Sequence, residues 1–445
     1  GEAEATRFAG DLNALGVAAA VFPARDYVLR PIEGTAREYE YRRLAVLGEL
    51  VGGRLRAVAV PAEALTQFTT PKEDFCANTR TLHAGDTLLR DDLLAALFGA
   101  GYTRRAQVDG PGQFSVRGDI VDIFAPDQKM PVRMEFWGDE IDTLHTFDLT
   151  TQRREDAIDK FYLSPAREVL FGKPADAAEQ LRAFLAKQRG KKKTAMTDCM
   201  AADLDLLDGG AVPVNMDKYL AVRYPHPATV LDYFDDPILV AEEPASIREA
   251  DRATTYRRGE ELKSLILDGV LCAGLDNLYA DPSYLWSKTG HYRTICAENF
   301  ARSMPDQPLK DIINAPAHSL PAWNGEVAGL LEDLKPLCDA GYTVTLLAGT
   351  DRAAAGLARD LRDKGILVTT DAAAAPAAGL VQVLAGHLSA GCEFPFAKYA
   401  LLTGRAFGET SSQKKKRKKA KDALNSLTEI TPGDLVVHQN HCLLY

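Results

Sequence analysis

The residues best placed for chemistry in this sequence are two adjacent acids, Glu242 and Glu243, which follow the apolar run 237–241. Carboxylates at the end of a strand can hold the Mg²⁺ that accompanies a nucleoside triphosphate. A phosphate-binding loop of the form G-x-x-x-x-G-K-[ST] does not occur in the sequence, however. The residues therefore predict no nucleotide site, and the acidic pair is interpreted as favourable to the dipole of the following helix.

Other residues that could bind metal or attack a substrate are scattered. His438 and His441 lie three apart in a predicted strand and should face opposite sides, which is a poor metal geometry. The patterns G-x-S-x-G, H-E-x-x-H and C-x-x-C are missing, and the seven cysteines are widely spaced, as in proteins of a reducing cytoplasm. We predict no metal, no cofactor and no catalytic residues, although the 62 acidic residues leave a carboxylate-pair hydrolase open as an alternative.

Length and composition predict several folded units. The chain has 445 residues, which suggests about three domains at roughly 150 residues each. It has 46% hydrophobic residues and a formal charge of −10, from 52 basic and 62 acidic residues. Because no apolar run reaches the ~18 residues of a membrane-spanning helix, we expect a soluble protein.

The coarse pattern predicts an α/β multidomain protein. Short apolar runs at 16–22 and 56–60 should be strands around a helix at 33–50, and strands that alternate with helices favour a parallel layer. The same alternation returns after residue 155. There we expect a helix at 175–188, a basic turn at 190–193, a strand at 237–241 and a helix at 245–267.

Between these parts lies a segment with an antiparallel β pattern. In 131–137, Val132, Met134 and Phe136 alternate with Arg133 and Glu135, so we expect one buried face and an exposed Arg133. A turn at 138–139 leads to a strand at 141–147, and 114–124 is predicted as one preceding strand. A short helix at 91–100 comes before them.

A Pro-rich stretch at 305–321 marks a boundary, after which a compact α/β unit is expected, with helices at 324–337 and 352–364. A dense basic run follows, made of Lys414, Lys415, Lys416, Arg417, Lys418 and Lys419. We interpret it as a solvated linker, with a nucleic-acid contact as the alternative. The first residue is Gly, and 434–445 still has a strand pattern at its end, so we expect a fragment of a longer protein.

The β-rich segment carries a family resemblance. Residues 101–126, 131–142 and 147–152 closely resemble the β-rich domain shared by the excision-repair protein UvrB and the transcription-repair coupling factors, the Mfd family. Residues 320–325, 344–349, 388–395, 403–408 and 427–438 are similar to the segments that follow this domain in the Mfd family. The resemblance is therefore to the N-terminal half of that family, without its translocase motor.

The resemblance implies a domain order. A degenerate UvrB-like α/β domain of the P-loop-helicase type would occupy 1–88 and 155–316, with the β-rich insert at 89–154. A small α/β domain at 317–410, a basic linker at 411–426 and an incomplete start of the RNA-polymerase-interacting domain at 427–445 would follow.

The resemblance also implies a function. A chain of this kind would be a non-catalytic, cytoplasmic docking platform for UvrA, with Glu242 and Glu243 as the relic of an ATPase site. RNA polymerase and DNA would be bound only through the complete protein, whose distal motor could mask the UvrA surface. The UvrA-contacting positions would be Arg104, Arg105, Arg117 and the apolar anchor Phe124.

Simpler interpretations of these residues remain open. Phe124 at a strand end could be a core residue, and Arg117 could be merely solvated. Gly110, Gly112 and Gly118 are expected to serve turns or a bulge. At the level of function, the alternatives are a UvrB-like nucleotide-dependent enzyme of damage recognition and a nucleic-acid-binding module that uses residues 414–421.

Overall fold

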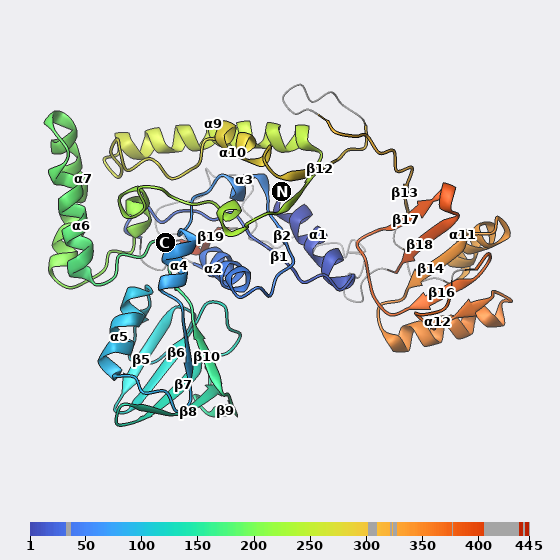
Figure 1. Ribbon diagram of the computed structural model, residues 1–445, viewed down its shortest axis with the longest axis horizontal. Helices are drawn as coiled ribbons and strands as arrows, with labels where there is room; N and C mark the ends of the chain where they lie inside the picture. Colours follow the sequence, from blue (N-terminus) through green and yellow to red (C-terminus); the bar gives the residue numbers. More distant parts are fainter. Residues whose placement is uncertain are drawn as a thin grey trace. The chain divides into compact units, whose positions relative to one another are not determined.

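The computed structural model describes residues 1–32, 37–300, 309–320, 323, 327–375, 377–404, 436–438 and 441–444 (Figure 1). The chain forms two compact units, one made of residues 1–5 and 20–303, the other of 6–19 and 304–445. Helix α1 (Glu2–Ala14) contributes to both. Among the described residues, no helix is long and apolar enough to cross a membrane. The fold is mixed α/β with several separate sheets.

The α/β part of the first unit contains two small sheets. Strands β1 (Ala19–Val21) and β2 (Ala57–Ala59) pair with each other, and β11 (Ile238–Glu242) pairs in parallel with β12 (Arg293–Ala297). The helices of this part are α2 (Glu38–Val51), α3 (Ala62–Leu65), α4 (Lys72–Ala77), α6 (Pro174–Ala186), α7 (Gly190–Asp208), α8 (Leu220–Arg223), α9 (Pro244–Leu267) and α10 (Pro282–Thr289). Short 3₁₀ turns lie at Met216–Tyr219 and Val230–Tyr233. The basic turn predicted at 190–193 is wrong, because these residues form the first turn of α7.

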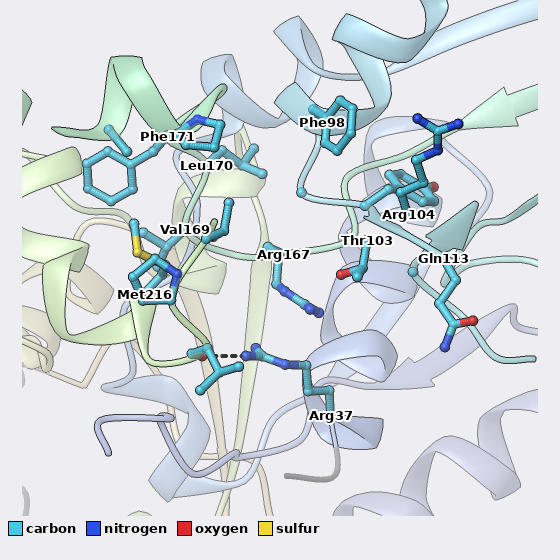
Figure 2. Close-up of a pocket in the computed structure, with 18 of the residues that line it drawn as sticks. Arg37, Phe98, Thr103, Arg104, Gln113, Arg167, Val169, Leu170, Phe171 and Met216 are labelled. Carbon is cyan, nitrogen blue, oxygen red and sulfur yellow. Dashed lines mark hydrogen bonds between the residues drawn. The ribbon is translucent and has the colours of Figure 1, made fainter. Parts of the chain in front are cut away.

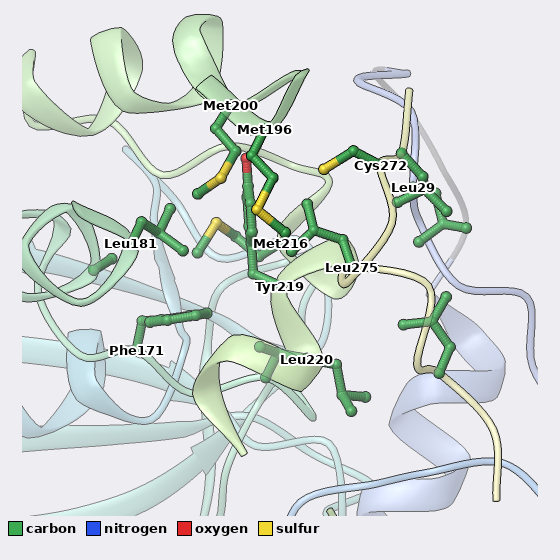
Figure 3. Close-up of a cluster of buried hydrophobic side chains, with 14 of the residues drawn as sticks. Leu29, Phe171, Leu181, Met196, Met200, Met216, Tyr219, Leu220, Cys272 and Leu275 are labelled. Atoms are coloured by element: carbon green, nitrogen blue, oxygen red, sulfur yellow. The ribbon is translucent and has the colours of Figure 1, made fainter. Parts of the chain in front are cut away.

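A sulfur-rich apolar cluster forms the largest core of this part. Met196 and Met200 of α7 pack with Met216 and Tyr219, and Figure 3 shows these side chains gathered together. Methionine fills irregular space well because its chain is unbranched and flexible. The cluster therefore joins α6, α7 and the segment around residue 220 to the chain that follows α9.

Buried ion pairs hold distant segments of the first unit together. The Arg43 Nε donates to Glu168 Oε1 at 2.5 Å, and Arg25 donates to Asp217 through two nitrogens, at 2.7 and 3.0 Å. Glu40 is also buried, and its Oε1 accepts the Glu168 amide at 3.0 Å. Charges removed from water require partners of this kind, because an unpaired buried ion is very costly.

The β-rich domain is built on a six-stranded sheet. Its strands, in spatial order, are β4 (Thr103–Arg104), β5 (Gln113–Arg117), β6 (Ile120–Phe124), β7 (Val132–Trp137), β8 (Glu140–Phe147) and β9 (Arg154–Ala157). β4 and β5 are parallel, and all other neighbours are antiparallel. Helix α5 (Arg90–Gly99) packs on one face, where Leu93 and Leu97 meet Phe114, Ile123 and Met134. β3 (Arg80–His83) and β10 (Lys160–Leu163) form an antiparallel pair beside it.

The hairpin β5–β6 corrects one prediction. Residues 114–124 do not form a single strand, because Gly118 adopts a left-handed backbone (φ +61°) and turns the chain back at Gly118-Asp119. Arg117 then pairs with Ile120 directly across the turn. A Gly in the left-handed region is what a two-residue hairpin turn requires.

The second unit contains a six-stranded mixed sheet. Its spatial order is β13 (His318–Leu320), β17 (Gly391–Phe394), β18 (Tyr399–Thr403), β14 (Thr343–Leu347), β16 (Val381–Leu384) and β15 (Val368–Thr369). Strands β18, β14, β16 and β15 run parallel, and α11 (Val327–Asp339) and α12 (Asp351–Asp363) supply apolar side chains to the core.

The described residues near the C-terminus form two paired strands rather than a single strand. β19 (Val436–His438) and β20 (His441–Leu444) are antiparallel, and His438 pairs directly with His441. The prediction that both histidines lie in one strand is therefore wrong. The basic run Lys414–Lys419 lies outside the described residues.

Candidate functional site

The β-rich sheet has one apolar face and one polar face. Since side chains alternate along a strand, residues that lie in register on neighbouring strands share a face. Ser115 pairs with Asp122, Asp122 with Arg133, and Arg133 with His145, so these residues form one row across β5, β6, β7 and β8. The row lies on the face opposite the core that α5 covers.

Asp122 is the centre of this row. Its carboxylate is fully buried and accepts from Arg133 Nε at 2.6 Å and from a terminal nitrogen of Arg133 at 2.9 Å. Arg117 donates to the same carboxylate at 2.6 Å. These bonds raise the pKa of Arg133 despite its burial. The two guanidinium groups are thus fixed by a single acid in the middle of the sheet.

Arg133 is buried, and the prediction that it is exposed is wrong. It does point away from Val132 and Met134, as the alternation requires, but the chain after β8 covers it. Another of its nitrogens donates to the Gln152 carbonyl at 3.2 Å, and its guanidinium carbon lies 4.8 Å from the ring centroid of Phe147. Alternation along a strand identifies the face of a residue but not what lies above that face.

Phe124 is also buried, which contradicts its expected role as an exposed anchor. Its side chain is 6% exposed and packs with Val108 and Phe147 in a small apolar cluster. The Gly112 amide donates to the Phe124 carbonyl at 2.8 Å, which closes the end of β6 against the segment before β5. The alternative interpretation, a core residue, fits the structure.

The three predicted arginines are exposed but do not form one cluster. Arg117 has a 47% exposed side chain at the β5–β6 turn. Arg104, on β4, pairs with Phe114 of β5. Phe114 is three residues before Arg117 on β5, so Arg104 lies about 10 Å from Arg117 along the strand direction, at about 3.4 Å per residue. Arg105 follows directly and is exposed as well. The structure thus separates one arginine at the hairpin from two at the β4 edge.

Arg104 and Arg105 line a cavity of about 700 Å³ in the first unit. Figure 2 shows Phe98, Thr103, Arg104 and Gln113 on one side, Val169, Leu170, Phe171 and Met216 on the other, and Arg167 and Arg37 between them. Arg37 is already bonded to Glu40 at 2.7 Å and to the Val214 carbonyl at 2.6 Å. Neither Arg37 nor Arg167 was predicted, because both come from segments far from β4 in the sequence.

Gly112 allows the segment before β5 to approach Tyr41 of α2 closely. Gly112 has φ +74°, and a Cβ atom there would lie 2.8 Å from the Tyr41 hydroxyl oxygen. A larger residue at position 112 would therefore both strain the backbone and collide with Tyr41. Gly110 has no such positive φ, so only Gly112 and Gly118 of the three predicted glycines adopt the left-handed region.

The acidic pair Glu242 and Glu243 has a local role. Glu242 ends β11, and Glu243 (φ +50°) precedes α9. The Glu243 carboxylate accepts from the amide and the side-chain nitrogen of Asn299, both at 2.9 Å. Within the described residues, no three His, Cys, Asp or Glu side chains are grouped so that they could hold a metal ion.

Two residues of the sheet were missed by the sequence analysis. Asp122 is an acid in the middle of a strongly apolar strand, and such an acid needs a buried cation, so the signal was present. Trp137 at the end of β7 is 82% exposed, although its neighbour Phe136 is buried.

Comparison with known proteins first defines the class of the domain. Residues 81–169 match the family model described as the UvrB interaction domain. This range extends on both sides of the expected insert and includes β10 and all but the first residue of β3, which pair with each other.

The whole chain is similar to particular bacterial proteins. It is 26% identical over 434 residues to the transcription-repair-coupling factor of Bacillus subtilis (strain 168), which covers 95% of this chain and 37% of that protein. The corresponding factor of Staphylococcus haemolyticus is 26% identical, with 94% and 36% covered, and that of Staphylococcus aureus (strain MRSA252) is 25% identical, with 94% and 37% covered. The chain thus spans a little over a third of the length of these relatives, and the resemblance predicted from the sequence is confirmed.

Proposed function

We propose that this chain is a non-catalytic region of a transcription-repair coupling factor and that its β-rich domain docks a UvrA-type protein. Docking would bring nucleotide excision repair to a stalled RNA polymerase, and contacts with polymerase and DNA would need the complete protein. In the complete protein the distal motor would mask the same surface. The observation that carries the proposal is the match of residues 81–169 to the UvrB interaction domain, together with similarity along 95% of the chain.

The arrangement of Arg117 supports its role at the interface. One of its nitrogens is held by the buried Asp122, which fixes the direction of the guanidinium, while 47% of the side chain remains exposed. Arginine can pair with a partner's carboxylate through two parallel hydrogen bonds, and arginines are frequent among the residues that dominate interface energies. Because Asp122 already orders the side chain, less rotamer freedom is lost on binding.

Arg104 and Arg105 would add a second contact at the β4 edge, about 10 Å from Arg117 along the sheet. Arg104 is in register with the core residue Phe114, so it lies on the face opposite Arg117 and the partner would reach it around the edge of the sheet. Phe124 is not part of the proposed contact, since it is buried under the loop that also covers Arg133.

We further propose that the α/β part of the first unit derives from a UvrB-like, helicase-type domain. The parallel pair β11–β12, the long helix α9 that follows β11, and the acids at the end of β11 support this origin. An active nucleotide-dependent enzyme, the alternative interpretation, gains no support from the acids, because Glu243 is bonded to Asn299.

Titration of the chain with purified UvrA tests the proposal. The Arg117→Ala variant should bind at least about 30-fold more weakly, the effect of losing a hot-spot residue worth about 2 kcal/mol. Arg182→Ala is the matched control, since Arg182 has a 52% exposed side chain and is also paired with an aspartate, Asp208, on a different part of the unit. Its affinity should be unchanged. Equal weakening by both substitutions, or no binding by the folded wild-type chain, would contradict the proposal.

A further inference from the structure

Trp137 is the most conspicuous unexplained residue of the β-rich domain. It ends β7, is 82% exposed, and lies on the same face as Glu135, since Phe136 between them points into the core. A tryptophan can bury 150–250 Å², so its exposure leaves a large apolar surface in water. On a sheet face that otherwise carries ions, such a residue is a candidate contact for a partner.

The backbone around Trp137 is firmly held. Trp137 pairs with Glu140 across the two-residue turn Gly138-Asp139, in which Gly138 has φ +63°. The chain before α5 supports this hairpin through three backbone bonds. The Leu88 amide donates to the Asp139 carbonyl at 2.7 Å. The Ile141 amide donates to the Asp86 carbonyl at 2.9 Å, and the Gly85 amide donates to the Ile141 carbonyl at 2.7 Å. The indole is therefore presented from a fixed frame, which lowers the entropy lost when a partner covers it.

The charges around Trp137 differ on its two sides. Toward β5, the Phe136 amide donates to the Asp119 carbonyl at 2.9 Å, which brings the β5–β6 turn and Arg117 to the same end of the sheet. The exposed Asp119 carboxylate on this turn is paired with Arg90 at 3.3 Å, so Arg117 supplies the basic charge on this side. Toward β8, its cross-strand neighbour Glu140 and then Asp142 are exposed. A partner that receives the indole would match this pattern with carboxylates on the β5 side and basic groups on the β8 side.

We propose that Trp137 is the aromatic anchor of the docking surface and inserts into an apolar recess of the partner whose rim is acidic on one side and basic on the other. This inference rests on the proposed function, in which the partner is a UvrA-type protein. It assigns to Trp137 the role that the buried Phe124 cannot have. Arg117 then fixes the orientation of the partner, because an ion pair at one side of the recess selects a single direction of approach.

The test compares four chains for affinity to purified UvrA. Trp137→Ala should weaken binding at least about 30-fold, as loss of a central aromatic anchor does. Trp137→Phe keeps an aromatic ring and should lose less than about fivefold, because much of the apolar contact area is retained. The matched control is Tyr256→Ala, because Tyr256 is a 74% exposed aromatic residue on α9 in the same unit. Its affinity should stay within about twofold of the wild type, as for a surface residue outside an interface.

A second measurement does not depend on substitution. The chain has three tryptophans, Trp137, Trp286 and Trp323, and labelling with 5-fluorotryptophan gives each a fluorine resonance. UvrA should shift the Trp137 resonance and leave the other two in place. If UvrA binds the wild-type chain while the Trp137 resonance and the Trp137→Ala affinity are unchanged, the anchor is refuted and the docking function stands. If UvrA does not bind the wild-type chain at all, the proposed function itself fails.

Discussion

Removal of the Asp122 carboxylate is the most informative perturbation of the β-rich domain. In Asp122→Ala, Arg133 is left 9% exposed with its charge unpaired, apart from its bond to the Gln152 carbonyl. Breaking a buried ion pair by removing one partner costs about 3–5 kcal/mol. Arg117 adds little to this cost, because its half-exposed side chain can turn to water. We therefore expect the free energy of unfolding of this domain to fall by at least about 3 kcal/mol, near the lower end of the 3–5 kcal/mol range.

Hydrogen exchange followed by mass spectrometry measures this loss in the whole chain. Peptides from β6 and β7 should exchange about 150-fold faster, because a loss of about 3 kcal/mol raises the equilibrium constant for opening of the domain by that factor. Asp119→Ala is the control, since Asp119 has a 79% exposed side chain paired with Arg90 at 3.3 Å and should change exchange only slightly. The double variant Asp122→Ala, Arg133→Met should recover much of the protection, because it removes the orphaned charge and keeps an apolar chain in its place. Unchanged exchange in Asp122→Ala, or no recovery in the double variant, would refute this reasoning.

Two further predictions concern ionisation. Burial opposes the charge of Glu40, but Arg25, Arg37, Arg167 and the Glu168 amide outweigh it and hold the pKa of the Glu40 carboxyl at about 2. Since this value is below the ordinary pKa of about 4.3, the ionised carboxyl stabilises the fold above that pH, and the contribution is lost as the pH falls from about 4.3 to 2. The urea midpoint of Glu40→Gln should therefore depend less steeply on pH in this window than that of the wild type, while the exposed-site control Glu38→Gln should follow the wild type. Parallel curves for Glu40→Gln would contradict the assignment. A hydrogen bond from Cys272, helped by Lys218 and opposed by burial, lowers the pKa of Cys199 to about 7. Alkylation of Cys199 by iodoacetamide should then reach half its maximal rate near pH 7, and Cys272→Ala should raise this midpoint toward the ordinary thiol value of about 8.5. A midpoint near 8.5 in both chains would show that the two thiols do not interact.

The sequence predicts the regular parts of the β-rich domain well. Strand β7 follows from strict alternation and the hairpin from the Gly138-Asp139 turn, whereas β8 has a register shift that alternation does not predict. Helix α5 follows from its apolar positions Leu93 and Leu97. The β5–β6 turn was overlooked because apolar residues on both sides of Gly118 resemble one continuous strand. Its signal was nevertheless present in the pair Gly118-Asp119.

Burial by distant segments is the part that sequence reasoning could not supply. Phe124 and Arg133 lie on the polar face, where an exposed position is the natural expectation, yet Val108 and the residues around Phe147 cover them. The Arg43–Glu168 pair joins residues 125 positions apart, and no local pattern indicates that both are buried. Such contacts follow from the packing of whole elements rather than from propensity or periodicity.

The central claim is that the β-rich sheet docks a UvrA-type protein through its polar face and its β4 edge. The most direct test is hydrogen exchange of the whole chain with and without purified UvrA. The account predicts that protection increases in peptides from β4 to β8, including the Arg117 and Trp137 turns, and that exchange in the second unit is unchanged. Binding that leaves the exchange of β4 to β8 unaltered, or that protects only other parts of the chain, would contradict it.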